Sequence, residues 1–217
     1  MGQTKSKWKN GQIAFYDGST YETVKPIAPA ILYDDFLGTT TNTDIWTSLH
    51  NGGGSIAHAT SNLTLSLAGA GATEEEGVSG KDDKAWNADK GFIFECRLKL
   101  TTAPTLTAEV IMGVQNDNWG AGANRSFAAD EVTIGAFFGF YSTVGAGLVA
   151  QIRTDFTDAT NVLFYIDGVA VATSTTFDMS NGTNIMFQPV VVIQKVGAGG
   201  EAGVCVLDYI KMWQPTR

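Results

Sequence analysis

The chain holds only two cysteines, two histidines and five prolines among its 217 residues. Two cysteines cannot form the dense disulfide framework of a small secreted domain, and no Cys/His spacing typical of a zinc site is present. Charged residues make up only 17% of the chain, so serine, threonine, asparagine and glycine must cover much of its surface. The densest apolar run, 134–140, has the length of a strand and is too short to cross a bilayer. No membrane partner is therefore expected.

Signals for export are also missing. The start, 1–6, is polar and no apolar segment follows it, so no signal peptide is predicted. Its Met-Gly-x-x-x-Ser pattern matches a myristoylation site, but this short pattern depends on a eukaryotic host. Cys96 and Cys205 lie in expected strands, so we expect two buried reduced thiols and synthesis in the cytosol.

The net charge of −8 is unevenly distributed along the chain. Residues 1–33 carry four lysines against Asp17 and Glu22, a local balance of +2, which leaves −10 for the remainder. An acidic body repels phosphate, so nucleic acid is not expected as a partner.

Alternating apolar and polar residues predict one strand after another and no helix longer than a turn or two. The clearest alternation lies in 92–100, where Glu95, Arg97 and Lys99 point away from the apolar face. Further strands are expected at 63–67, 107–115, 132–140, 148–154, 162–166, 169–173, 185–193 and 204–213. Asp167-Gly168 separates two β-rich runs and predicts a hairpin.

These strands resemble, in order, the blocks of the concanavalin A-like jelly rolls of the laminarinase type. Asp34-Asp35-Phe36 with Trp46 resembles the opening strand; 62–65 and 91–99 resemble the next blocks, and 163–168 with 204–213 the closing pair. The resemblance implies an all-β, two-sheet antiparallel jelly-roll sandwich over 34–217. With the segment 10–19 ahead of it, the chain also looks like virion proteins of tailed bacteriophages.

Residues 1–33 are expected to form an extended N-terminal arm. Pro26 and Pro29 favour a path outside any sheet, and so short a segment cannot bury its own aromatic side chains. The residues expected to contact the particle or a neighbouring subunit are Lys5, Lys7, Trp8, Lys9, Phe15, Tyr16 and Tyr21. A solvated tail is the alternative.

The catalytic pattern of the retaining glucanases is incomplete in this chain. In that family, Glu-x-Asp-x-x-Glu on one strand supplies two carboxylates about 5 Å apart, a nucleophile and an acid/base. The nearest stretch, 131–136, keeps Glu131 but has Thr133 and Ala136 at the other positions. His50 and His58 lie in a Gly-rich segment, read as a loop, without a nucleophile motif. We therefore predict that the chain is not an enzyme.

Sugar binding needs an exposed aromatic ring beside amide and carboxylate groups. One expected loop offers such a set: Asn116, Asp117, Asn118, Trp119 and Arg125. Trp86 is a second candidate. The alternatives are that both tryptophans lie in the core and that Asn-Asp-Asn forms a turn.

The resemblance also implies a structural calcium between Asp208 and either Asp34 or Asp35. The favoured alternative is that Asp208 accepts hydrogen bonds from the backbone at a strand corner. No other cofactor is expected. Glu74-Glu75-Glu76 and Asp82-Asp83 are read as solvated loop charges.

The leading hypothesis is a non-enzymatic structural protein of a bacteriophage virion. It would decorate the capsid surface as a homo-oligomer, assembled in the host cytoplasm and anchored by its arm to the major capsid protein or other virion proteins. The alternative is a carbohydrate-binding module or tail adhesin that recognises host surface glycans. A glycan-cleaving enzyme with rearranged catalytic residues ranks third.

Overall fold

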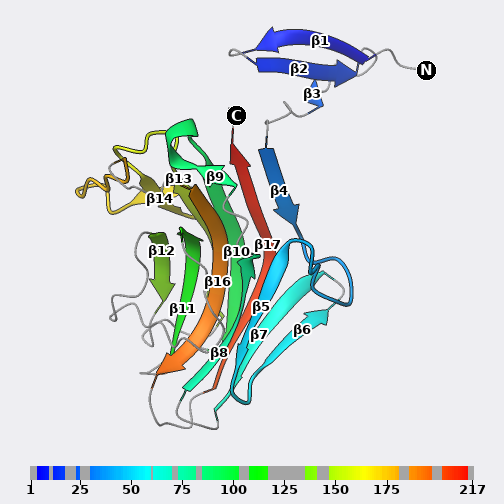
Figure 1. Ribbon diagram of the computed structural model, residues 1–217, viewed down its shortest axis with the longest axis vertical. Coiled ribbons are helices and arrows are strands. Elements are labelled where there is room, and N and C mark those ends of the chain that lie inside the picture. The colour runs from blue at the N-terminus through cyan, green and yellow to red at the C-terminus, as the bar shows by residue number, and fades with distance from the viewer. Residues whose placement is uncertain are drawn as a thin grey trace.

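A computed structural model of the chain shows two antiparallel sheets packed face to face and a small third sheet (Figure 1). It describes residues 4–9, 12–17, 23–24, 30–59, 61–69, 73–81, 85–102, 108–116, 135–140, 147–180, 186–196 and 202–214. The predicted jelly-roll sandwich is confirmed. In the described part of the chain, no helix is long and apolar enough to cross a bilayer.

The larger sheet has eight strands and is organised around β17 (Ala202–Gln214). The other seven are β4 (Ala30–Asp34), β6 (Ser55–Ala59), β7 (Asn62–Ala68), β10 (Ile93–Thr102), β13 (Val149–Asp155), β14 (Leu163–Ile166) and β15 (Val169–Val171). One side of β17 pairs with β10, and the other side pairs first with β7 and then with β4.

The second sheet has six strands, and β16 (Met186–Val196) lies near its middle. Its other strands are β5 (Trp46–Asn51), β8 (Thr73–Gly80), β9 (Trp86–Asn87), β11 (Ala108–Gln115) and β12 (Gly135–Phe140). A single 3-10 turn, η1 (Ala88–Lys90), follows β9 and is capped by the Asn87 side chain.

Apolar side chains on the facing surfaces of the two sheets form the core. Phe92 stacks on Phe156 with ring centroids 4.3 Å apart, and both rings contact Phe187. The alternation predicted in 92–100 is confirmed, because its apolar members are buried in this core. Cys96 and Cys205 lie in the same core as free thiols, as expected. Burial raises the pKa of both thiols, that of Cys205 to about 12.

The predicted hairpin joins β14 to β15. Asp167 and Gly168 adopt φ of +49° and +79°, and Phe164 pairs with Val171 across the turn. Positive φ at both central residues is the geometry that Asp-Gly tolerates and that matches the twist of the flanking strands.

The N-terminal segment forms a sheet of its own. β1 (Thr4–Lys9), β2 (Gln12–Asp17) and β3 (Thr23–Val24) pair in that order. Of the predicted contact residues, Lys5, Lys7, Trp8 and Lys9 lie on β1 and Phe15 and Tyr16 on β2, while Tyr21 lies outside the described residues.

β4 lies just before the predicted domain boundary at residue 34 and already belongs to the larger sheet. Ala30–Asp34 pairs along its whole length with β17, and Leu32 packs against the core.

Candidate functional site

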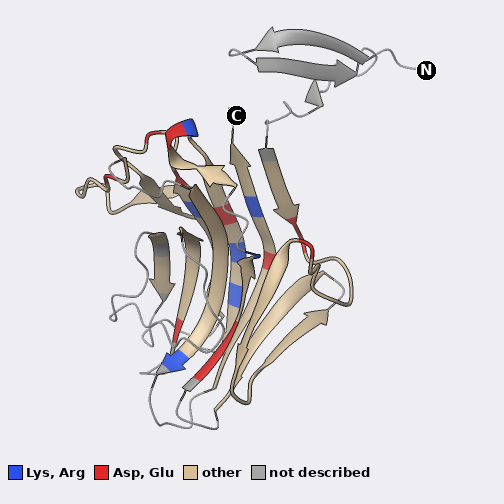
Figure 2. Ribbon diagram, in the orientation of Figure 1, with Lys and Arg blue, Asp and Glu red and all other residues tan. Residues whose placement is uncertain are grey.

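Five polar and aromatic side chains form a row across the outer face of the eight-stranded sheet, and we call it the aromatic row. Its members are Tyr33 on β4, Lys211 on β17, Glu95 on β10, Arg153 on β13 and Tyr165 on β14. Residues opposite one another in register share a face of the sheet, so these side chains lie side by side. Figure 2 shows the acidic and basic positions that gather on β10 and β17.

Further contacts hold the rings of this face in place. The Arg153 guanidinium lies 5.1 Å from the centroid of Tyr165 and 5.9 Å from that of Trp213, and the Lys211 ammonium lies 4.4 Å from Trp213. The Tyr209 hydroxyl donates to Glu95 Oε1 at 2.9 Å. Burial, followed by this hydrogen bond, raises the pKa of Tyr209, so the hydroxyl stays protonated and remains a donor.

A hollow of about 190 Å³ opens beside the end of the row, and we call it the Tyr33 hollow. Tyr33 and Leu37 are 56% and 66% exposed, so its mouth is open to solvent. The residues that line it are Tyr33, Asp34, Phe36, Leu37, Thr40, Asn42, Ile45 and His58. An exposed aromatic ring thus stands beside an amide, a hydroxyl, a carboxylate and an imidazole, the groups expected of a small polar ligand site.

Local backbone geometry shapes this hollow. Phe36 adopts φ of +52°, which is unusual for a bulky residue, and its ring is buried against Trp46. Asp34 holds the turn, because its two oxygens accept from Phe36 N at 2.8 Å and from Trp46 Nε1 at 2.7 Å. His58 Nε2 lies 2.8 Å from Thr41 Oγ1, while its buried Nδ1 has no hydrogen-bond partner. Strained backbone of this kind is concentrated at functional sites.

The carboxylates expected to hold calcium are engaged by protein groups. Asp208 Oδ2 accepts from Arg97 Nη1 at 3.0 Å, because an irregularity in the β10–β17 register turns Asp208 to the outer face. Asp34 is occupied as described above, and Asp35 accepts from Leu37 N. Among the described residues, no group of three or more His, Cys, Asp or Glu side chains comes together, and the calcium site stays a prediction.

Only two of the residues predicted to bind sugar lie in the part of the chain that the structure describes. Trp86 is 6% exposed and packs against Phe92 in the core, so its ring offers no platform. Asn116 is also buried, at the end of β11. Asp117, Asn118, Trp119 and Arg125 lie outside the described residues, so the prediction for that loop stays a prediction.

The strand expected to carry the glucanase residues is β12. Ala136 is buried in the core, so its position points away from the outer face, and Glu131 and Thr133 lie outside the described residues. Two other glutamates flank Gln194 on the outer face of the six-stranded sheet. These are Glu75 and Glu109, and Gln194 Nε2 donates to Glu109 Oε1 at 2.5 Å. All three are buried, so no polysaccharide reaches this pair.

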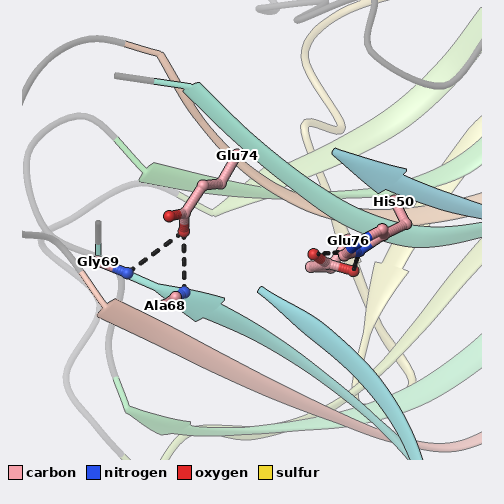
Figure 3. Close-up of polar contacts among 5 residues, drawn as sticks. All are labelled: His50, Ala68, Gly69, Glu74 and Glu76. Atoms are coloured by element: carbon pink, nitrogen blue, oxygen red, sulfur yellow. Dashed lines mark hydrogen bonds and ion pairs between the residues drawn. The ribbon is translucent and has the colours of Figure 1, made fainter. Parts of the chain in front are cut away.

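Reading Glu74, Glu75 and Glu76 as solvated loop charges is wrong. They lie on β8 and all three are 0% exposed. Glu74 Oε2 accepts from Ala68 N at 2.8 Å and from Gly69 N at 3.3 Å (Figure 3). The Lys195 ammonium lies 3.8 Å from Glu74 Oε1. Backbone donors and a cation therefore offset the cost of burying this charge. Asp82 and Asp83 lie outside the described residues.

Glu76 faces His50, which lies on β5 rather than in a loop. Figure 3 shows the imidazole directed at the carboxylate, with Nδ1 at 2.8 and 2.9 Å from the two oxygens. Burial is the main cause that raises the pKa of Glu76, and the charges of Glu74 and Glu75 add to it, while His50 opposes it. About half of the His50 side chain is exposed, so the His50 side of this pair is accessible to solvent.

Sequence reasoning missed the aromatic row, although one signal for it was present. Glu95 was correctly placed on the outward face of its strand, and Tyr209, Lys211 and Trp213 alternate on the closing strand. The register that sets β4, β17, β10 and β13 beside one another is not local in the sequence, so the row itself could not be foreseen.

Solved structures of carbohydrate-related proteins share this fold. A β-1,3-glucanase from Mycobacterium marinum is 15% identical over 86% of this chain and 100% of its own, with a TM-score of 0.54. The carbohydrate recognition domain of Emp47p is 8% identical over 83% of this chain and 93% of its own, with a TM-score of 0.53. A sialidase is 13% identical with a TM-score of 0.55; the match covers 93% of this chain but only 21% of the sialidase. No family model and no curated protein sequence matches.

The expected likeness to the concanavalin A-like jelly rolls is thus confirmed at the level of the fold. The prediction that the chain is not an enzyme is corrected, because several of the similar structures are named as glycosyl hydrolases or β-glucanases. The incomplete Glu-x-Asp-x-x-Glu pattern argued only against one mechanism on one strand. The same fold occurs in a β-1,3-glucanase and in a carbohydrate recognition domain, so it serves enzymes as well as binding domains.

Proposed function

We propose that this chain binds carbohydrate, with the Tyr33 hollow as the primary contact and the aromatic row as its extension. The observation that carries the proposal is the open Tyr33 ring at the mouth of a hollow lined by Asn42, Thr40 and His58. An aromatic face packs against the apolar face of a sugar ring, and the polar groups fix its hydroxyls.

The shape of the surface favours an oligosaccharide over a single sugar. The hollow is small, but the row continues from Tyr33 through Lys211, Glu95 and Arg153 to Tyr165. The cations and the carboxylate of the row can each bind hydroxyl groups, so further sugar units would find partners along it. Two structures of similar fold, a β-1,3-glucanase and a carbohydrate recognition domain, are named for carbohydrate ligands, and this supports the same ligand class here.

A glycan panel with three variants tests the proposal. Tyr33→Ala should abolish or strongly weaken binding, because it removes the platform, whereas Tyr33→Phe should keep most of it. Val169→Ala, at the far edge of the same sheet, is the matched control and should bind as the parent does. The site would be refuted if Tyr33→Ala bound glycans as well as the parent, or if the parent bound no glycan on the panel. Release of soluble sugars from the same glycans would show whether binding leads to cleavage.

The placement of the chain in a bacteriophage virion rests on sequence resemblance, and we keep it as a second proposal. In it, the sheet of β1, β2 and β3 attaches the protein to the particle and to neighbouring copies. Quantitative mass spectrometry of purified particles tests this: copies comparable to the shell subunit support capsid decoration, a few copies support a tail position, and none refutes it. Removal of residues 1–24 should abolish attachment while the sandwich still folds.

A further inference from the structure

Lys195 and Glu74 form an ion pair inside the sandwich. The two residues lie directly opposite each other on β16 and β8, and both side chains are 0% exposed. Taking a carboxylate and an ammonium out of water costs more than their attraction returns unless the geometry is excellent. Here Lys195 Nζ lies 3.8 Å from Glu74 Oε1, which is longer than a hydrogen bond.

The other oxygen of Glu74 is held by the backbone. Ala68 N, at the end of β7, and Gly69 N, just after it, both donate to Oε2, at 2.8 and 3.3 Å, while Oε1 has no hydrogen-bond partner. Two backbone N–H groups aimed at one oxygen of a carboxyl group are the arrangement that stabilises the oxyanion of a tetrahedral intermediate in acyl transfer. The oxygen that faces Lys195 is the one that could leave.

We propose that Lys195 and Glu74 condense to an intramolecular amide bond that joins β16 to β8. One proton passes from the Lys195 ammonium to Glu74 Oε1, which leaves a neutral amine and a neutral acid. The nitrogen lone pair then attacks Cδ, and Oε2 takes up the negative charge between Ala68 N and Gly69 N. The Nζ–Cδ bond forms as the Cδ–Oε1 bond breaks, and Oε1 leaves as water with a second proton from Nζ. No oxidant or other reactant is needed.

Burial supplies both the driving force and the proximity. Condensation replaces two buried charges by one neutral amide, which removes the cost of keeping an ammonium and a carboxylate away from water. Strand pairing holds the two groups face to face, which gives a high effective concentration, and rotation of the Lys195 side chain closes the remaining gap.

The mass of the purified full chain decides the question. The amide predicts an intact mass lower than that of the sequence by one water. Trypsin would then leave 154–211 uncut at Lys195 and joined to 10–81, because an acylated lysine is not cleaved and Lys25 precedes proline. A mass equal to that of the sequence, with complete cleavage after Lys195, would overturn the proposal.

Two variants check the chemistry. Glu74→Gln should lose ammonia instead of water and reach the same final mass as the cross-linked parent. Lys195→Met keeps a flexible side chain of nearly the same length and should show the full mass of its sequence. The parent measurement stands without them if either variant fails to fold, and loss of water in Lys195→Met would contradict the assignment to Lys195.

Discussion

Replacing Phe92 with alanine should remove a large part of the stability of the sandwich. Phe92 is 0% exposed, and its ring lies 4.3 Å from that of Phe156, 5.8 Å from Phe187 and 6.4 Å from Trp86, measured between centroids. A buried Phe→Ala change costs about 3–5 kcal/mol from lost burial and from the cavity left behind. Three neighbouring rings lose their partner at once, and each aromatic pair adds about 0.5–1.5 kcal/mol, so we expect the upper half of that range.

The measurement is urea unfolding at neutral pH, with the free energy of unfolding taken from the midpoint and slope. Native domains are stable by only about 5–15 kcal/mol, so the midpoint should fall steeply. Val169→Ala, at a residue that is 67% exposed on the edge strand β15, is the control and should change stability by less than about 0.5 kcal/mol. A loss below about 2 kcal/mol for Phe92→Ala would mean that the site collapses around the gap, and that the two sheets do not depend on this ring.

Three further outcomes follow from other positions. Burial raises the pKa of Glu76 in the folded state. The stability that protonated Glu76 contributes is therefore present below its unfolded pKa near 4.5 and is lost as the pH rises through the folded pKa. Glu76→Gln should flatten this pH dependence in thermal unfolding curves. Cys96 and Cys205 should resist iodoacetamide at pH 8 in the folded protein and react only after denaturation, and rapid labelling would contradict their burial. Gly168→Ala should cost about 1 kcal/mol, because its φ of +79° strains any residue with a Cβ, although no atom lies within 4 Å of that position.

Local patterns predicted many of the strands and the hairpin because the physical causes of these elements are local. The alternation in 92–100 places apolar side chains on one face whatever the partner strand is, and Asp167-Gly168 needs only its own dihedral angles. Sequence analysis therefore reached the sandwich and many of its strands, but it did not predict β5, β6 or β8, which lie where loops were expected.

The burial of Glu74, Glu75 and Glu76 could not be predicted in this way. Three consecutive glutamates are typical of a solvated surface, and only their pairing with β16 brings Lys195 and Gln194 to them. The Tyr33 hollow depends likewise on distant residues, because Asp34 must reach Trp46 Nε1 and His58 must reach Thr41.

The position of β16 and β17 in the chain has a consequence for synthesis on the ribosome. β17 pairs with β4, β7 and β10, and β16 pairs with β8, β9 and β11, and every one of these partners is translated earlier. Neither sheet can close while its central strand is still in the exit tunnel, and the emerging strands present unpaired edges until then. Folding of this sandwich is therefore completed only after β17 has left the ribosome, and nascent chains stalled before residue 202 should depend on chaperones to stay soluble.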